Sequence, residues 1–148
     1  MQPISLRSER HWLAARVGPE RRAGTYAFRS LVDAGVVVAG SSDAPIESVD
    51  VLAAVQAAVT REGFEPAQAL TVTEALGIYT TGAASVRGQV GETGAVAVGQ
   101  RADLVVLGAD PRTVAPTAIG AIDVLATVVG GVDVHRDERL VIQRGAGG

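Results

Sequence analysis

The sequence contains no cysteine and no lysine. Without cysteine, the chain cannot form a disulfide, a thiolate metal site or a thiol nucleophile. Aromatic residues make up only 3% of the chain, so the 47% of residues that are hydrophobic are mainly Val, Ala and Leu. Such a composition suits the packing of helices against strands better than the aromatic platforms on which nucleic-acid bases stack.

A strong charge of either sign is also missing. The net charge is -3 and the sequence pI is near 5.3, which argues against a nucleic acid or another polyanion as a partner. The first residues, MQPISLRSERHW, lack the apolar core of a signal peptide, and no apolar run approaches the length of a membrane span. We therefore expect a cytoplasmic protein with neither a nucleic-acid nor a membrane partner.

The first half of the sequence has the pattern of an α/β protein. Residues 19–34 predict a helix, because Pro19 suits the first turn and Gly35 supplies a stop. Residues 36–39 then form a short, continuous apolar run, which is typical of a strand covered on both faces.

Two further helices are predicted after this run. One should begin near Asp50, whose carboxylate is a good N-cap, and extend to about residue 62. The other should cover residues 71–85, because Thr71 and Glu74 stand at the spacing of a capping box.

The character of the sequence changes after about Gly88. Residues 88–100 are Gly-rich, with the spacing of glycines that turns between short strands have. Residues 102–111 predict a strand that ends in a turn. In residues 124–135 two apolar runs flank Gly130-Gly131, which is the signal of a two-residue hairpin. The last residues, QRGAGG, are expected to form a frayed tail.

Asp43 is the one residue of the first half that points to chemistry. It follows the apolar run of residues 36–39 closely, and α/β enzymes place catalytic groups at the carboxyl ends of parallel strands. A carboxylate there can ligate a metal, accept a proton from a metal-bound water, or do both. An Asx turn or a local cap explains a lone acid before Ala-Pro equally simply, and spacing alone favours that structural role.

Several segments taken in order resemble one family. They include YAFRSLVDAGVVVAGSSDAPIESVDVLAAVQAAVTR, EALGIYTTGAA, GAVAVGQRADLVVLGADP and VLATVVGGVDV. In this order and separation they resemble the C-terminal part of metal-dependent amidohydrolases, in the branch that includes N-substituted formamide deformylases. The resemblance implies a (β/α)8 barrel with a small β-sandwich beside it. Residues 1–88 would supply the last barrel strands and helices, and residues 89–148 the C-terminal sandwich segment.

The resemblance also implies a role for Asp43. In such enzymes the matching aspartate ends the eighth strand, binds the metal-activated water and acts as general acid and base. The metal would be divalent, with zinc expected, and Asp43 would take part in holding it only in a complete site. The remaining parts of that site are missing here, because the sequence has no His-x-His pair and no lysine that could be carboxylated. Three protein ligands are usual for catalytic zinc, so we expect this chain alone to hold no metal and to be inactive.

The two histidines do not restore the site. His11 is expected in the loop after the seventh strand, where it could contact a substrate, although a surface or packing role is favoured. Relatives often carry a histidine where this sequence has Ser5, so a contribution to substrate binding from that position is in doubt. His135 stands among charged residues at the end of the predicted hairpin and should be solvated.

Two functions from different classes remain open. The favoured one is hydrolysis of a C–N bond in a small amide or formamide, performed by an enzyme of which this chain is the C-terminal portion. The alternative is a non-catalytic α/β-plus-β module that binds a partner protein through open sheet edges. A barrel reduced to two strands exposes such edges, so self-association or pairing with a missing N-terminal half is expected.

Overall fold

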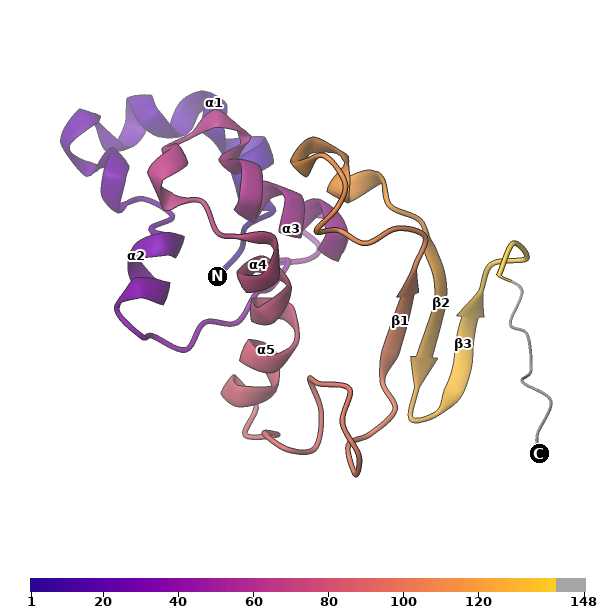
Figure 1. Cartoon of the computed structure of the whole chain (residues 1–148). Coiled ribbons are helices and arrows are strands. Elements are labelled where there is room, and N and C mark those ends of the chain that lie inside the picture. The colour runs from indigo at the N-terminus through magenta and orange to yellow at the C-terminus, as the bar shows by residue number, and fades with distance from the viewer. Residues whose placement is uncertain (141–148) are drawn as a thin grey trace, which may run out of the picture.

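The computed structural model describes residues 1–140, which form a helical body and a small antiparallel sheet (Figure 1). The helical body comprises residues 1–88. It contains five α-helices, α1 (Ser5–Val17), α2 (Phe28–Asp33), α3 (Val51–Thr60), α4 (Val72–Tyr79) and α5 (Thr81–Val86), and three short 3-10 helices, η1 (Pro19–Gly24), η2 (Arg61–Gly63) and η3 (Pro66–Gln68). The α/β class is confirmed. The predicted tail of residues 143–148 lies outside the described residues.

Helix α3 forms the centre of the helical body. Its N-cap is Asp50, as predicted, and the Asp50 carboxylate accepts a hydrogen bond from the Ala53 N–H (2.9 Å). The helix ends at Arg61, which adopts a left-handed conformation with φ 56°. Its small alanine side chains are buried, so neighbouring elements can approach its backbone closely.

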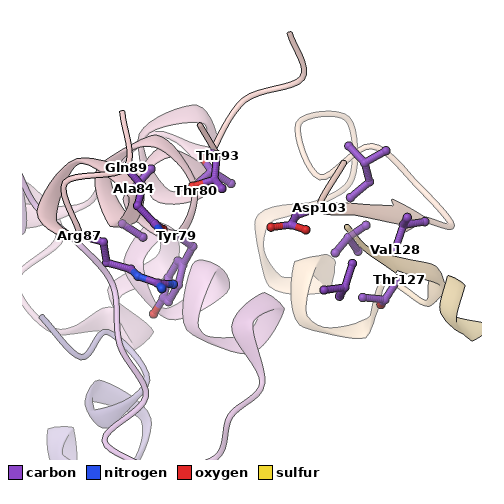
Figure 2. A pocket seen from close by; sticks show the side chains of 14 residues that line it. Tyr79, Thr80, Ala84, Arg87, Gln89, Thr93, Asp103, Thr127 and Val128 are labelled. Atoms are coloured by element: carbon purple, nitrogen blue, oxygen red, sulfur yellow. The ribbon is translucent and has the colours of Figure 1, made fainter. Parts of the chain in front are cut away.

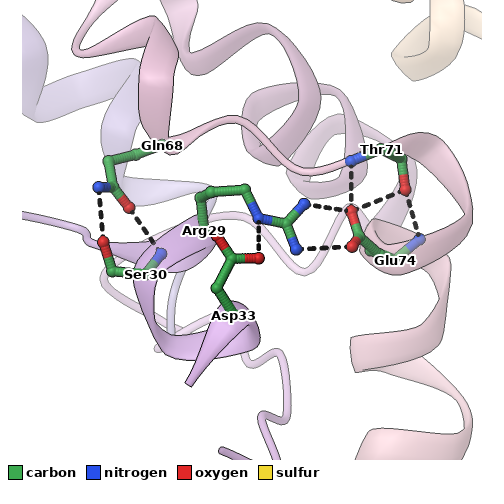
Figure 3. Close-up of polar contacts among 6 residues, drawn as sticks. All are labelled: Arg29, Ser30, Asp33, Gln68, Thr71 and Glu74. Carbon is green, nitrogen blue, oxygen red and sulfur yellow. Dashed lines mark hydrogen bonds and ion pairs between the residues drawn. The ribbon is translucent and has the colours of Figure 1, made fainter. Parts of the chain in front are cut away.

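The predicted capping box at the start of α4 is also confirmed. The Glu74 N–H donates to the Thr71 hydroxyl (3.2 Å), and the Thr71 N–H donates to the Glu74 carboxylate (2.8 Å). The same carboxylate accepts two hydrogen bonds from the Arg29 guanidinium of α2, at 2.6 and 2.8 Å (Figure 3). Glu74 therefore caps one helix and ties it to another.

Two predicted helices are interrupted in the structure. The helix expected over residues 19–34 is divided into η1 and α2, because Tyr26 adopts φ 52°. One distant and one local contact hold Tyr26 there: its hydroxyl donates to the Glu9 carboxylate, and its ring packs edge-on against the nearby Phe28. The helix expected over residues 71–85 breaks at Thr80 into α4 and α5.

The strand predicted for residues 36–39 is not formed. The segment is extended but lacks strand pairing, and Val36 and Val37 are 49% and 60% exposed. Met1 runs beside it: the Met1 nitrogen donates to the Ala39 carbonyl (2.7 Å), and the Ser41 N–H donates to the Met1 carbonyl (2.9 Å). This is the pattern of a single parallel bridge. One paired residue is too short a ladder to make a strand.

The sheet contains β1 (Leu104–Leu107), β2 (Val124–Val129) and β3 (Val132–Arg136), paired antiparallel in the order β1-β2-β3. The predicted strand and the predicted hairpin are thus both confirmed. Gly130 and Gly131 have φ 57° and 83°, and a tight hairpin turn needs such positive values at both central residues. In the preceding Gly-rich segment of residues 88–100, turns and one isolated bridge replace the expected short strands.

The 3-10 helix η4 (Pro116–Ala121) fastens the sheet to the helical body. Ile119 is fully buried in the main hydrophobic core, beside residues of α3 and α4. The Gly120 N–H donates to the Gln56 side-chain oxygen of α3 (2.9 Å). In Figure 1 the sheet stands beside the helices, with η4 lying over α3.

Candidate functional site

The loop of residues 41–50 carries Asp43 and leaves the extended segment at Ser41. The Gly40 N–H donates to the Ile78 carbonyl at the end of α4 (2.9 Å), while Ser41 bonds to Met1 on the other side. The backbone that enters the loop is therefore held from two sides.

Asp43 itself is exposed and adopts φ 61°, a left-handed conformation that Asp tolerates better than most residues. Its carbonyl accepts a hydrogen bond from the Ile46 N–H (2.9 Å), and the Ser42 hydroxyl accepts one from the Ala44 N–H (3.2 Å). These contacts close a tight turn through the backbone. The Asp43 carboxylate takes part in no ion pair within residues 1–140.

The far end of the loop is attached to α1. The Ser8 hydroxyl donates to the Glu47 carboxylate, so the turn after Asp43 lies against the first half of that helix. Glu47 thus belongs to the surroundings of Asp43.

His11 lies within α1 and is exposed, so the expectation that it belongs to a loop is wrong. The physical reason is that residues 5–17 have no helix breaker before Gly18. His11 follows Ser8 by one helical turn and shares its face of α1. Within residues 1–140, no hydrogen bond joins His11 to Asp43.

His135 is exposed on β3, as predicted, with its Nε2 atom 3.1 Å from the Val124 carbonyl oxygen. It belongs to the sheet and not to the Asp43 loop. Asp103 has a structural role in the sheet. Hydrogen bonds from the Gly130 N–H (2.7 Å) and from Arg101 (2.8 Å) hold the pKa of Asp103 below its usual value and fix the hairpin turn beside β1.

The residues present do not fit a metal ion by themselves. Within residues 1–140, His, Cys, Asp and Glu side chains nowhere gather in the group of three that a protein-bound metal needs. Asp43 contributes one carboxylate, and the nearby Glu47 carboxylate is engaged by Ser8.

Tyr79 at the end of α4 is a neighbour of this loop that the sequence analysis missed. Its ring lies directly against Gly40, two residues before Ser42. Burial raises the pKa of Tyr79 to about 12, so the phenol stays protonated across the physiological range. The glycine after the apolar run of residues 36–39 was the one available sign that a bulky group approaches there.

Two hollows lie between the helical body and the sheet. One has a volume of about 400 Å³, with Tyr79 and Arg87 on the helical wall and Asp103 and Thr127 on the sheet wall (Figure 2). The other, of about 530 Å³, is lined mainly by apolar side chains, among them Leu76 of α4 and Val105 of β1. Asp43 lines neither hollow.

The most deeply buried charge lies at the opposite end of α3 from the Asp43 loop. Arg61 has no exposed surface, and its guanidinium stacks 4.7 Å from the centre of the Phe28 ring. Burial lowers the pKa of Arg61 to about 10, so the side chain remains charged at neutral pH. A cation at a helix C-terminus is favourable, and we assign Arg61 a structural role.

Among residues 1–140, no helix combines the length and the apolar character that a membrane crossing requires.

Comparison with known proteins identifies the family. The amidohydrolase family matches residues 1–135 of this chain. YtcJ of Bacillus subtilis (strain 168), which is named as an amidohydrolase, is 33% identical over 143 residues, which cover 91% of this chain and 27% of YtcJ. The N-substituted formamide deformylase of Arthrobacter pascens is 38% identical over 112 residues, which cover 72% of this chain and 21% of that enzyme.

The fold is shared with solved structures. A crystal structure of an uncharacterized metal-dependent hydrolase from Pyrococcus horikoshii OT3 matches with a TM-score of 0.71 and 33% identity, over 78% of this chain and 25% of that one. The chain spans about a quarter of the length of the relatives that it matches. By its sequence match and its fold, this chain belongs to the amidohydrolase family.

Proposed function

We propose that this chain is the C-terminal part of a metal-dependent hydrolase that cleaves a C–N bond in a small amide or formamide. Residues 1–88 would supply the last strands and helices of a (β/α)8 barrel, and residues 89–148 the strands of an adjoining sandwich. The observation that carries the proposal is the family match over residues 1–135, which includes the Asp43 loop. The named activity of the A. pascens relative supports a formamide as the substrate class.

Asp43 is the proposed general acid and base. A base in this role accepts a proton from the attacking water and later donates it to the leaving nitrogen. Its exposed carboxylate and its place just after the bridge between Met1 and Ser41 suit this task. His11, an exposed residue of α1, is the proposed substrate contact.

A divalent metal, zinc in our proposal, would need ligands from outside residues 1–140. Asp43 would join these ligands only in the complete site. The isolated chain is therefore expected to be inactive and to depend on association with the remaining part of such an enzyme.

One observation favours a second candidate, a non-catalytic module that binds a partner protein. Every residue of β3 is exposed at the edge of the sheet, and an open edge can accept a strand from another chain. This candidate needs no role for Asp43, which separates it from the first.

The test is a chimera in which this chain replaces the matching segment of the A. pascens deformylase. We expect the chimera to hydrolyse N-substituted formamides, and Asp43→Asn to lower kcat by about 10²–10⁴. Asp33→Asn is the matched control, because Asp33 is an exposed acid of α2 paired with Arg29. A folded chimera that is inactive, or one that keeps its rate in Asp43→Asn, would contradict the proposal. The isolated chain should show no turnover.

A further inference from the structure

The backbone before Asp43 approaches the α4–α5 junction more closely than any side chain on it would allow. A Cβ placed on Gly40 would lie 2.6 and 2.7 Å from the Cε1 and Cε2 atoms of Tyr79. A Cβ on Gly82 of α5 would overlap the Val38 carbonyl oxygen. Neither glycine has a positive φ. Both positions therefore need glycine for space and not for backbone conformation.

Tyr79 is packed against the core on the one hand and lines both hollows between the helical body and the sheet on the other. Its ring packs against a second small core cluster formed by Ile4, Ala53 and Ala54, which are all buried. This cluster restricts the ring, so relief of an overlap at residue 40 would be shared between the ring and the backbone of the extended segment.

The helix break at Thr80 adds a second contact at the same place. Thr80 has φ -118° and ψ -93°, which ends α4. The Thr80 carbonyl then accepts a hydrogen bond from the Ala84 N–H of α5 (3.0 Å). The Ile78 carbonyl, which a continuous helix would use internally, accepts the Gly40 N–H instead (2.9 Å). The ring of Tyr79 and the carbonyl of Ile78 thus both contact Gly40 and together fix its position.

We propose that Tyr79 is a positioning residue for the proposed reaction: its ring, seated on Gly40, fixes the backbone from which Asp43 projects. This inference rests on the proposed role of Asp43. Gly40 is three residues from Asp43, and the bridge to Met1 holds the segment on its other side. A displacement of a reacting group by about 1 Å can lower the rate by about 10². A methyl group at residue 40 should therefore displace Asp43 and lower the rate of the proposed reaction.

The ring carries this role and the hydroxyl does not. The Tyr79 hydroxyl is buried and has no hydrogen-bond partner within residues 1–140. Removal of an unpaired polar atom leaves no partner stranded. Tyr79→Phe should therefore behave like the parent chain in every assay below.

The first experiment measures amide hydrogen exchange on the full 148-residue chain. Gly40→Ala should speed exchange at Ser41 by about tenfold or more, because its bond to Met1 is disturbed. The matched control is Gly24→Ala, since Gly24 has open space around it and an ordinary φ. Combining Gly40→Ala with Tyr79→Leu, which removes the overlapping ring atoms, should restore slow exchange. Unchanged exchange in Gly40→Ala, or a double variant no better than the single one, would overturn the inference.

The second experiment uses the deformylase chimera. Gly40→Ala should lower kcat by about 10² with KM nearly unchanged, and Tyr79→Leu should recover most of that loss in the double variant. A general loss of stability would not be repaired by a second truncation. If Asp43→Asn abolishes turnover while Gly40→Ala leaves kcat intact, the positioning role is wrong and the proposed function stands. If Asp43→Asn has no effect, the proposed function itself fails.

Discussion

The helical body and the sheet of this chain differ in how completely their apolar side chains are covered. Nearly all buried hydrophobic residues described lie in the helical body, whereas Ala126 is the one such residue of the three strands. β3 alternates Val132 and Val134 with polar residues, yet all its residues are exposed. The helical body thus has its own core, and the sheet depends on η4 for its attachment.

The difference indicates which part of the chain is self-sufficient. Polar contacts in the helical body join distant segments, as between Arg29 and Glu74, whereas several ion pairs near the sheet join residues two or three apart, as between Arg136 and Asp133. Local pairs on an exposed surface contribute little to stability. We therefore expect mutations in the two regions to differ sharply in effect.

The largest contrast should come from Ile119→Ala and Val134→Ala. Ile119 is fully buried against the helical body, so its truncation should lower the free energy of unfolding by about 2–5 kcal/mol. Val134 is 60% exposed, and its truncation should change stability by less than about 0.5 kcal/mol. Urea denaturation followed by circular dichroism measures both. Equal effects would mean that the sheet is as well covered as the helices.

A smaller effect is expected at Glu74. Bonds from Arg29 and from the Thr71 N–H lower the pKa of Glu74 from 4.5 to about 2. Because folding lowers this pKa, the stabilisation by the carboxylate is present above about pH 4.5 and disappears as the pH falls toward 2. Glu74→Ala should cost about 1–2 kcal/mol at pH 7 through loss of the cap.

Glu74→Gln is the matched variant, since glutamine can keep the cap but cannot keep the charge. Its deficit relative to the parent should be present at pH 7 and vanish near pH 2. A deficit that is the same at both pH values would show that the ion pair with Arg29 does not stabilise the fold. Thermal unfolding at a series of pH values decides this.

The smallest effect on stability, but a visible one on association, is expected for Val134→Lys. Lysine on an exposed edge strand opposes pairing with another strand. Light scattering should show less self-association than in the parent chain, with a stability change below about 0.5 kcal/mol. Ser48→Lys, in an exposed loop of the helical body, is the control for added charge. If both variants reduce self-association equally, the added charge and not the sheet edge is responsible.

The features that the sequence predicted correctly are local ones. The Asp50 cap, the capping box of Thr71 and Glu74 and the hairpin at Gly130-Gly131 depend on residues a few positions apart. The failures depend on distant partners. Tyr26 breaks a helix because the distant Glu9 holds its hydroxyl, and within residues 1–140 no second strand lies beside residues 36–39.

The candidate site shows the same division. The resemblance of its segment to the amidohydrolases pointed to Asp43. The contact of Tyr79 with Gly40 brings together residues 39 positions apart, and the glycine alone does not say which side chain packs on it. The metal ligands lie beyond what either the sequence or residues 1–140 of the structure supply.

Zinc titration of the purified 148-residue chain, by calorimetry with the deformylase chimera alongside, tests the central claim most directly. We predict no stoichiometric binding to the chain alone, and about one or two chelator-sensitive zinc ions per chimera. Stoichiometric binding to the isolated chain that is lost in Asp43→Ala would contradict the account, because the chain would then assemble a metal site without the rest of the enzyme.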